Sequence, residues 1–199
     1  MKKSELRTIY LEKQKSLQPA ERSEKSALVV QGLFDNFDFS ATRFLNCFVT
    51  LEKNNELDTF EIFGRIWREF PNVATCAPRI NYEMNLLENV VAAPTTKYVQ
   101  NKWGILEPEG DDFVEPQKLD VILVPLIAFD VAGFRCGYGK GFYDKFLRKC
   151  RADCRKIGLS LFPPVEKIED IENFDVPLNF CVTPEKIWQF DQLIINKRL

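Results

Sequence analysis

Residues 130–144 combine glycines and charged side chains at fixed offsets. The segment reads Asp-Val-Ala-Gly-Phe-Arg-Cys-Gly-Tyr-Gly-Lys-Gly-Phe-Tyr-Asp and follows an apolar run over residues 121–129. A strand that leads into a glycine-rich loop and then a helix brings backbone N–H groups up to a phosphate. Arg135 and Lys140 can neutralise phosphate charge, and Asp144 can hold a cation. The segment therefore predicts a polyphosphate site, with a nucleotide and a metal ion as the expected ligands.

Two common phosphate-binding loops do not match this segment. A Walker A loop needs Gly at residue 134 and Ser or Thr at residue 141, where this chain has Phe and Gly. The dinucleotide fingerprint needs its third glycine one residue later than Gly141. A tight surface turn is the alternative, but the fixed offsets of Arg135, Lys140 and Asp144 favour the phosphate site.

The composition argues against several classes of protein. The 199-residue chain has a net charge of -2 and a pI of about 5.4. Nucleic acids and membrane surfaces attract a basic face, so neither is an expected partner. No apolar run approaches the ~20 residues of a membrane span, and the first residues lack the apolar stretch of a signal peptide. We expect a single cytoplasmic domain over residues 1–199 that works as a monomer.

The chain has no histidine, which excludes His-dependent triads, His metal sites and His general bases. Most of the six cysteines lie within apolar runs, where Cys acts as a small hydrophobic residue. Cys150 and Cys154 are four residues apart, but no other Cys pair or His completes a zinc site. Reduced thiols are expected. The chemistry must therefore rest on Lys, Arg, Asp, Glu, Tyr, the backbone and a bound metal.

Hydrophobic spacing divides the chain into alternating helices and strands. Residues 82–92 are expected to form a strand or a hairpin arm, and residues 93–119 a long polar connection. The expected helices span 3–17, 19–34, 58–70 and 141–149, and the expected strands span 44–50, 72–77, 120–125, 156–161 and 179–183. This order predicts an α/β fold of three layers, with a mainly parallel central sheet and helices on both faces, Rossmann-like and related to sugar-phosphate isomerase and CoA-transferase folds. The ligand is expected at the carboxyl ends of the strands.

Several segments in the same order resemble the 5-formyltetrahydrofolate cyclo-ligase family. The strongest is Phe129-Asp-x-x-Gly-x-Arg-x-Gly-Tyr-Gly-Lys-Gly-Phe-Tyr-Asp144, which is similar to the family signature F-D-x-x-G-x-R-L-G-x-G-x-G-Y-Y-D. It differs at Cys136, in place of Leu, and at Phe142, in place of Tyr. Shorter matches lie at residues 3–7, 56–59, 78–79 and 103–108. The resemblance covers nearly the whole chain.

The resemblance implies an ATP-driven cyclisation with ATP and Mg²⁺ as cofactors. The substrate would be 5-formyltetrahydrofolate, with or without a polyglutamate tail, and the products 5,10-methenyltetrahydrofolate, ADP and phosphate. Phosphoryl transfer would activate the formyl oxygen, and N10 of the folate would then attack the carbon. Both nucleophiles belong to the substrate, so the protein would mainly orient groups and neutralise charge.

The same resemblance implies the residues of the site. Lys140 and Arg135 are the expected catalytic residues, because they would carry the charge of the triphosphate. The magnesium ligands would be Asp144 and Asp175. ATP contacts would be Lys3, Leu6, Arg7, Arg135, Cys136, Gly137, Tyr138, Gly139, Lys140, Gly141, Phe142 and Tyr143. Folate contacts would be Leu51, Glu56, Trp103, Tyr138, Gly139, Lys140, Gly141 and Phe142.

Ordinary structural roles compete with several of these assignments. Lys3 and Arg7 are one helical turn apart and could simply be a solvated helix face. Asp144 could stabilise a helix start without metal, and Glu56 could be an ordinary residue at a helix start. The chain also departs from the family pattern at Pro164, in place of Gln, and at Phe174, in place of His.

Other functions stay open at this point. The glycine-rich loop could bind a single phosphate in an enzyme related to sugar-phosphate isomerases or CoA-transferases. A nucleotide-sensing or interaction module that kept the fold is a second alternative. A nucleic-acid-binding role is disfavoured by the acidic pI.

Overall fold

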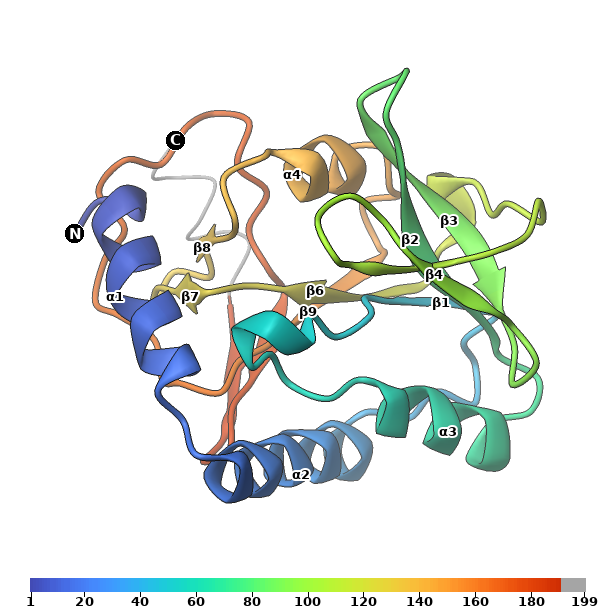
Figure 1. The fold of residues 1–199 in the computed structure, drawn as a ribbon, viewed down its shortest axis with the longest axis horizontal. Helices are drawn as coiled ribbons and strands as arrows, with labels where there is room; N and C mark the ends of the chain where they lie inside the picture. The colour runs from blue at the N-terminus through green and yellow to red at the C-terminus, as the bar shows by residue number, and fades with distance from the viewer. Residues whose placement is uncertain (191–199) are drawn as a thin grey trace.

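A seven-stranded sheet forms the centre of the molecule in the computed structural model, which describes residues 1–190 (Figure 1). Its strands are β1 (Phe44–Cys47), β2 (Ala74–Asn81), β3 (Leu86–Ala92), β6 (Val121–Pro125), β9 (Arg155–Leu159), β10 (Phe180–Val182) and β11 (Ile187–Gln189). They lie in the order β11-β10-β9-β6-β1-β2-β3. The inner strands run parallel, and the edge strands β3 and β11 are antiparallel to their neighbours. The predicted mainly parallel α/β sheet is confirmed.

The connections that follow the neighbouring strands β1 and β6 cross opposite faces of the sheet. It passes from β1 to β2 through α3 (Phe60–Glu69), and from β6 to β9 through α4 (Phe142–Leu147). These helices lie on opposite faces of the sheet (Figure 1). The connections that follow β1 and β6 therefore diverge, which opens a crevice at the carboxyl ends of these strands.

Alternating side chains along the strands enter two separate cores. Leu45, Leu123 and Ile157 point to the face covered by α3 and by α2 (Pro19–Asn36). Ile122 and Val124 point to the other face, where they pack with Phe146 and Leu147 of α4. Because both faces are covered, the central strands are apolar on both sides, as the continuous run over residues 121–125 requires.

Helix α1 (Lys3–Lys15) lies across the ends of the strands (Figure 1). Its Leu6 is fully buried in the core shared with α4, and its Gln14 is also buried. The two ends of α1 therefore lie beside loops that follow different strands of the sheet.

The observed elements correct several expectations. The supposed polar connection over residues 93–119 contains the hairpin β4 (Tyr98–Gln100) and β5 (Leu106–Pro108), and β11 was not expected. The strand expected to end at Pro78 continues to Asn81. Beyond Cys76, β2 pairs with β3 alone, so the missing N–H of Pro78 can face a side without a strand partner.

Other boundaries also differ, among them the ends of two helices. The first helix ends at Lys15 and not at residue 17, and α4 ends at Leu147 and not at residue 149. Residues 191–199 of the expected domain lie outside the described residues. No helix among residues 1–190 is long and apolar enough to cross a membrane.

A short hairpin separates β6 from the glycine-rich loop, which was expected to follow the strand directly. It pairs β7 (Ala128–Phe129) with β8 (Arg135–Cys136). Buried Asp130 closes its turn by accepting backbone hydrogen bonds from Ala132 and Phe134, both at 3.0 Å. The hairpin carries the chain from the sheet to the wall of the crevice.

Gly158 marks a close approach inside the second core, and its replacement gives a stability prediction. A Cβ at this position would lie 2.7 Å from both Leu126 Cδ2 and Leu178 Cδ1. We expect Gly158→Ala to lower the free energy of unfolding by about 1–3 kcal/mol, because the added methyl group overpacks the core. Urea denaturation followed by circular dichroism measures it.

Gly64 provides the matched control. It lies inside α3, and a Cβ there would meet only the flexible end of Arg68, at 3.4 Å. Gly64→Ala should raise the free energy of unfolding by about 0.5–1 kcal/mol, since alanine favours a helix. Equal stabilities for both variants and the parent protein would show that the core around Gly158 adjusts freely.

Candidate active site

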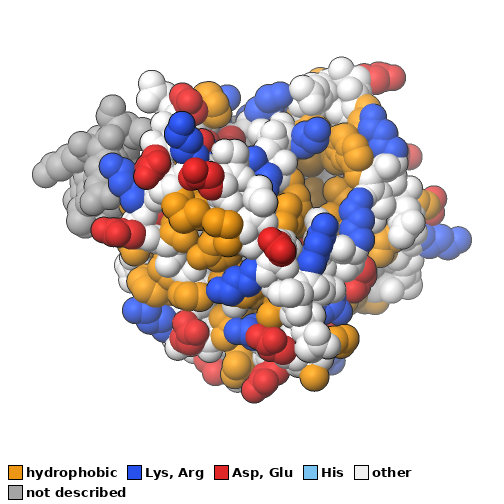
Figure 2. Space-filling view, turned by 60° about the vertical axis from the view of Figure 1, so that its left-hand side comes forward, with side chains coloured by type: hydrophobic (Ala, Val, Ile, Leu, Met, Phe, Trp, Pro, Cys, Tyr) orange, Lys and Arg blue, Asp and Glu red, His pale blue; other side chains and the backbone are white. Residues whose placement is uncertain are grey.

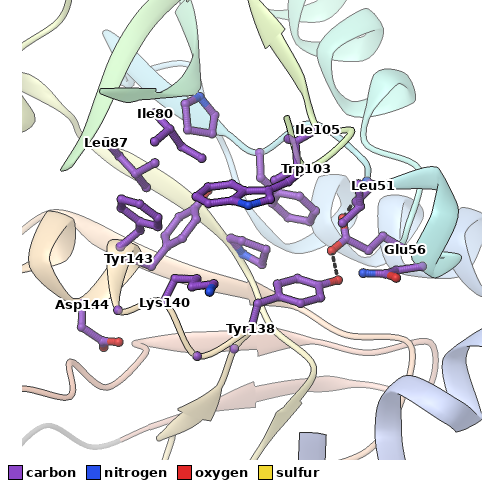
Figure 3. A pocket seen from close by; sticks show the side chains of 18 of the residues that line it. Leu51, Glu56, Ile80, Leu87, Trp103, Ile105, Tyr138, Lys140, Tyr143 and Asp144 are labelled. Carbon is purple, nitrogen blue, oxygen red and sulfur yellow. Dashed lines mark hydrogen bonds between the residues drawn. The ribbon is translucent and has the colours of Figure 1, made fainter. Parts of the chain in front are cut away.

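A cavity of about 580 Å³ lies at the carboxyl ends of β1 and β6. Figure 2 shows a hollow with hydrophobic side chains inside it and Lys and Arg side chains at its edge. Residues 137–141, here called the glycine loop, form one wall, and Trp103 lies on the opposite side (Figure 3). The volume is in the range of pockets that enclose small molecules and cofactors.

The glycine loop exposes its backbone to the cavity. Gly139 and Gly141 have φ of +84° and +69°, values that favour glycine, and Gly141 is the residue that precedes α4. A Cβ at Gly137 or Gly141 would find no atom within 4 Å, so both positions border open space. The loop thus offers backbone groups, at the start of a helix, to a ligand in the cavity.

Helix α1 holds the loop in place. Arg7 Nε donates a 2.8 Å hydrogen bond to the carbonyl of Gly137, and its guanidinium lies 3.1 Å from where a Cβ of Gly139 would be. Cys136 Sγ donates to the carbonyl of Lys3 at 3.2 Å. The alternative of a solvated helix face therefore does not apply to Arg7, which contacts the loop directly.

Arg135 is buried and paired with the expected metal ligand Asp144. Its guanidinium donates to Asp144 Oδ1 at 2.8 Å and to the carbonyl of Val176. The backbone N–H of Val176 donates to the same carboxylate oxygen at 3.2 Å. These contacts tie the start of α4 to the segment before β10.

Lys3 and Asp175 form a second ion pair at the cavity wall, and both side chains are largely buried. The backbone N–H of Glu172 also donates to Asp175 Oδ2, at 2.7 Å. Within residues 1–190, no group of three or more Asp, Glu, Cys or His side chains could hold a metal ion. The cavity therefore has two carboxylates in separate ion pairs.

Lys140 differs from the other cations of the cavity. It is exposed in the glycine loop and forms neither an ion pair nor a side-chain hydrogen bond within the described part of the chain. Lys3 and Arg135 are ion-paired, and Arg7 and Lys53 donate to backbone carbonyls. Figure 3 shows its side chain beside the cavity, between Tyr138 and Asp144. Its charge is therefore available to an anionic ligand.

Glu56 lies at the other end of the cavity and is only 9% exposed. Its Oε2 accepts a 2.7 Å hydrogen bond from the backbone N–H of Leu51, and its Oε1 accepts one from the hydroxyl of Tyr138. Burial raises the pKa of Glu56 to about 7, although both hydrogen bonds act in the opposite direction. Burial and the nearby charge of Glu56 also raise the pKa of Tyr138.

The turn that carries Glu56 is fixed by the end of α1. Gln14 Nε2 donates a 2.7 Å hydrogen bond to the carbonyl of Asn54, at the end of the 3₁₀ turn η1 (Glu52–Asn54). Asn55, with φ of +52°, donates from Nδ2 to the carbonyl of Lys15 at 3.1 Å. Glu56 therefore follows a turn that is held in place by hydrogen bonds with the end of α1, and it is not the first residue of a helix.

Trp103 faces the glycine loop from the β4–β5 connection. Its ring lies 6.1 Å from that of Phe142 and 5.5 Å from that of Tyr82. The ammonium group of Lys53 donates to its carbonyl oxygen. These contacts hold a flat aromatic surface at the rim of the cavity.

The cavity brings together all but two of the residues expected from the sequence. The exceptions are Leu6 and Cys136, which are fully buried and do not line it. The residues that line it are Lys3, Arg7, Leu51, Glu56, Trp103, Arg135, Gly137, Tyr138, Gly139, Lys140, Gly141, Phe142, Tyr143, Asp144 and Asp175. Phe174, which stands in place of the family's His, also lines the cavity and is 50% exposed.

Sequence reasoning missed much of the apolar wall. Ile80, Leu87 and Ile105 line the cavity from the β2–β3 hairpin and the β4–β5 segment (Figure 3). Their only sequence signal is the alternation of apolar residues in a hairpin, which is equally typical of a residue in the core. Lys53 was missed because nothing in its local sequence indicates the contact with Trp103.

Comparisons with known proteins point to one family. The family model described as the 5-formyltetrahydrofolate cyclo-ligase family matches residues 1–184. The chain is 32% identical over 145 residues to the 5-formyltetrahydrofolate cyclo-ligase of Escherichia coli (strain K12), covering 71% of this chain and 79% of that protein. It is 26% identical over 152 residues to the enzyme of the same name from Mus musculus, covering 73% of each. The solved structure of Aquifex aeolicus 5,10-methenyltetrahydrofolate synthetase is similar with a TM-score of 0.81 and 27% identity, over 96% of this chain and 94% of that one.

The raised pKa of Glu56 gives a prediction for stability. Between pH 4.5 and about 7 the native protein holds a proton on Glu56 that the unfolded chain has released. Stability from this group therefore falls as pH rises through that window and stays low above it. Glu56→Gln removes the titration, so the free energy of unfolding of the variant relative to the parent should rise by on the order of 2 kcal/mol from pH 5 to pH 8.

Urea denaturation of the parent and of Glu56→Gln at pH 5, 6, 7 and 8 measures this difference. The increase should be concentrated between pH 5 and pH 7. A difference that stays constant with pH would mean that Glu56 has the same pKa in the native and unfolded states.

Proposed function

The chain belongs to the 5-formyltetrahydrofolate cyclo-ligase family, enzymes of one-carbon folate metabolism, and we propose that it converts 5-formyltetrahydrofolate and ATP into 5,10-methenyltetrahydrofolate, ADP and phosphate. One observation carries the proposal. A single cavity joins a glycine loop suited to phosphates and a buried carboxylate suited to the N–H donors of a pterin.

The glycine loop fits a triphosphate. Its positions 137 and 141 border open space, its backbone lies at the start of α4, and Lys140 brings a positive charge without an ion-pair partner among the described residues. We propose that Lys140 contacts the phosphates directly. Arg135 is 7% exposed and held by Asp144, so its charge acts from beneath the loop.

Asp144 and Asp175 fit Mg²⁺ in its usual role beside a nucleotide. Magnesium takes oxygen ligands and is commonly held by one or two carboxylates together with substrate phosphates and water. Two carboxylates on one cavity wall match this need, and a dedicated cluster of three protein ligands is not required. In the ion pairs described above, Arg135 and Lys3 balance the charges of these carboxylates.

Glu56, Trp103 and the apolar wall fit the folate. A carboxylate accepts hydrogen bonds from adjacent N–H donors on a pterin ring, and Glu56 faces the cavity from the turn after β1. Trp103 and Phe142 offer flat rings at one side, and Ile80 and Leu87 provide apolar contacts. The folate and ATP would then meet near the glycine loop.

The chemistry that we propose needs no protein nucleophile. ATP supplies the phosphoryl group, which is transferred to the formyl oxygen of the folate to give an imidate phosphate. N10 of the folate attacks the formyl carbon and loses its proton, the C–O bond breaks, and phosphate leaves. Lys140 and the loop backbone would orient the phosphates and neutralise their charge. The chain has no histidine, and Cys136 is fully buried under the loop.

The direct test is the growth of methenyltetrahydrofolate absorbance in the near ultraviolet after protein, MgATP and 5-formyltetrahydrofolate are mixed. With ¹⁸O in the formyl group, the label should appear in the released phosphate, because that oxygen accepts the phosphoryl group. Label in water or on the protein would contradict the imidate phosphate. A protein that binds a simple phosphate but shows no stabilisation by MgATP would favour a phosphate-binding enzyme of another class.

We also propose that residues 1–199 act as one domain, as a monomer, and in the cytoplasm. The six cysteines are free, which suits a reducing compartment. The net charge of -2 gives no support for nucleic acid or membrane as a partner. The polyglutamate tail of the substrate would extend from the mouth of the cavity.

Replacing Lys140 tests its contact with the triphosphate. Lys140→Ala should weaken MgATP binding or slow turnover at least about tenfold, because a charge-assisted contact in the loop is lost. The melting temperature should be unchanged, since Lys140 is exposed. Calorimetry with MgATP and the absorbance assay measure both effects.

Lys145→Ala is the control for this prediction, because Lys145 is exposed on α4 and does not line the cavity. It should bind MgATP like the parent protein. Normal nucleotide kinetics in Lys140→Ala would remove Lys140 from the phosphate site.

Replacing Asp144 tests the magnesium assignment. Asp144→Asn keeps the shape and an acceptor oxygen for Arg135 but removes the negative charge. The Mg²⁺ concentration for half-maximal rate should rise about tenfold or more, because a hard cation binds a carboxylate better than an amide. A magnesium titration at saturating ATP gives the answer.

Asp153→Asn is the matched control, since Asp153 pairs with Arg151 away from the cavity. Its magnesium titration should coincide with that of the parent. An unchanged titration for Asp144→Asn as well would assign Asp144 a purely structural role beside Arg135.

A further inference from the structure

The hydrogen bond between Tyr138 and Glu56 joins the two ends of the cavity. Tyr138 belongs to the glycine loop, and Glu56 belongs to the turn that follows β1. Figure 3 shows the ring of Tyr138 reaching across to the carboxylate. The wall proposed for phosphate is thus bonded directly to the group proposed for the pterin.

This contact uses the acceptor that a ligand would need. The backbone N–H of Leu51 donates to Oε2 of Glu56, and the hydroxyl of Tyr138 donates to Oε1, so each oxygen keeps one further acceptor site. Glu56 is only 9% exposed, so it offers a ligand little other access. A donor that enters from the cavity must therefore compete with the hydroxyl of Tyr138.

Tyr138 is held less firmly than the groups around it. Tyr138 as a whole is 36% exposed, and residues 139–141 that follow it in the loop are also exposed. Glu56, in contrast, follows a turn fixed by Gln14 and Asn55 from α1. When the bond breaks, the loop is the part that can move.

We propose that Tyr138 is a displaceable placeholder for the ligand's hydrogen-bond donor at Glu56, so that filling the Glu56 site releases the glycine loop. Occupation of the two ends of the cavity is then coupled, because the conformation of the phosphate loop depends on what Glu56 binds. The identity of the donor as a pterin rests on the proposed function, whereas the effect of the contact on the loop does not.

Tyr138→Phe tests whether the hydroxyl of Tyr138 competes with the ligand for Glu56 or contacts the ligand itself. It keeps the ring and deletes the hydroxyl, so a ligand no longer competes with it. We expect 5-formyltetrahydrofolate, without ATP, to bind this variant about tenfold more tightly than the parent protein. Glu56→Gln should instead bind it at least about tenfold more weakly, since the charged acceptor is lost.

Hydrogen exchange in the absence of ligand tests whether the Tyr138–Glu56 hydrogen bond restrains the glycine loop. Amides of residues 137–141 should exchange several-fold faster in Tyr138→Phe than in the parent protein. Glu56→Gln keeps an acceptor oxygen for the hydroxyl, so its loop should exchange more slowly than that of Tyr138→Phe. Tyr82→Phe is the control, because Tyr82 is a 44% exposed ring beside Trp103 at the rim. Its loop exchange and its affinity should match those of the parent.

The two measurements decide different points. Parent-like loop exchange in Tyr138→Phe would overturn the placeholder, whatever the ligand is. Weaker folate binding by Tyr138→Phe would overturn it too, since the hydroxyl would then be a ligand contact. Absence of folate binding to the parent and to all three variants would refute the proposed function, and loop exchange would still decide whether Tyr138 restrains the loop.

Discussion

The contacts of one helix determine the shape of the cavity. Near its start, α1 binds the glycine loop through Arg7 and Gly137, and near its end it binds the turn before Glu56 through Gln14 and Asn54. These two segments follow different strands of the sheet, and α1 contacts both of them. A helix is stiff over this length, so its geometry sets the distance between Gly137, where the loop begins, and the turn before Glu56. Packing of Leu6 into the core anchors the helix to the sheet.

The charges of the cavity are arranged around this support. Arg135 and Asp144 neutralise one another, as do Lys3 and Asp175. The first pair is bonded to Val176, so the two pairs link β8, α4 and α1 to the segment before β10. Ion pairs of this kind hold backbone segments in register while keeping the net charge of the wall small. Against that background the charge of Lys140 stands out, because among the described residues it has no carboxylate partner and, unlike Arg7 and Lys53, no backbone carbonyl acceptor. Glu56, on the far side, is kept away from water, and this burial explains its raised pKa, to which the nearby charge of Glu52 adds.

Much of this arrangement could be predicted from the sequence, and the exceptions have physical causes. The central strands and the glycine loop carry strong local signals, namely a continuous apolar run over residues 121–125 and glycines where positive φ is needed. The β7–β8 hairpin was missed because its pairing is only two residues long and depends on Asp130 closing the turn. The β4–β5 hairpin was hidden by its prolines and polar residues, which are typical of a connection.

The residues of the cavity divide in the same way, into those with a local sequence signal and those without one. Residues of the glycine loop were found because their spacing is itself the signal, whereas Leu6 and Cys136 entered the prediction through the family resemblance and lie in the core. The apolar wall of Ile80, Leu87 and Ile105 depends on how two hairpins lie against the sheet, which no local pattern records.

The position of α1 has a consequence for how the protein is made. Arg7 bonds to a residue 130 positions later, and Lys3 pairs with one 172 positions later. During synthesis the helix leaves the ribosome well before its partners at Gly137 and Asp175. Central strands such as β1 and β2 can begin to assemble before then, while the cavity cannot be completed until Asp175 has been translated. Long-range contacts of this kind form late and slowly, so a chain interrupted before residue 137 would lack the glycine loop that α1 binds.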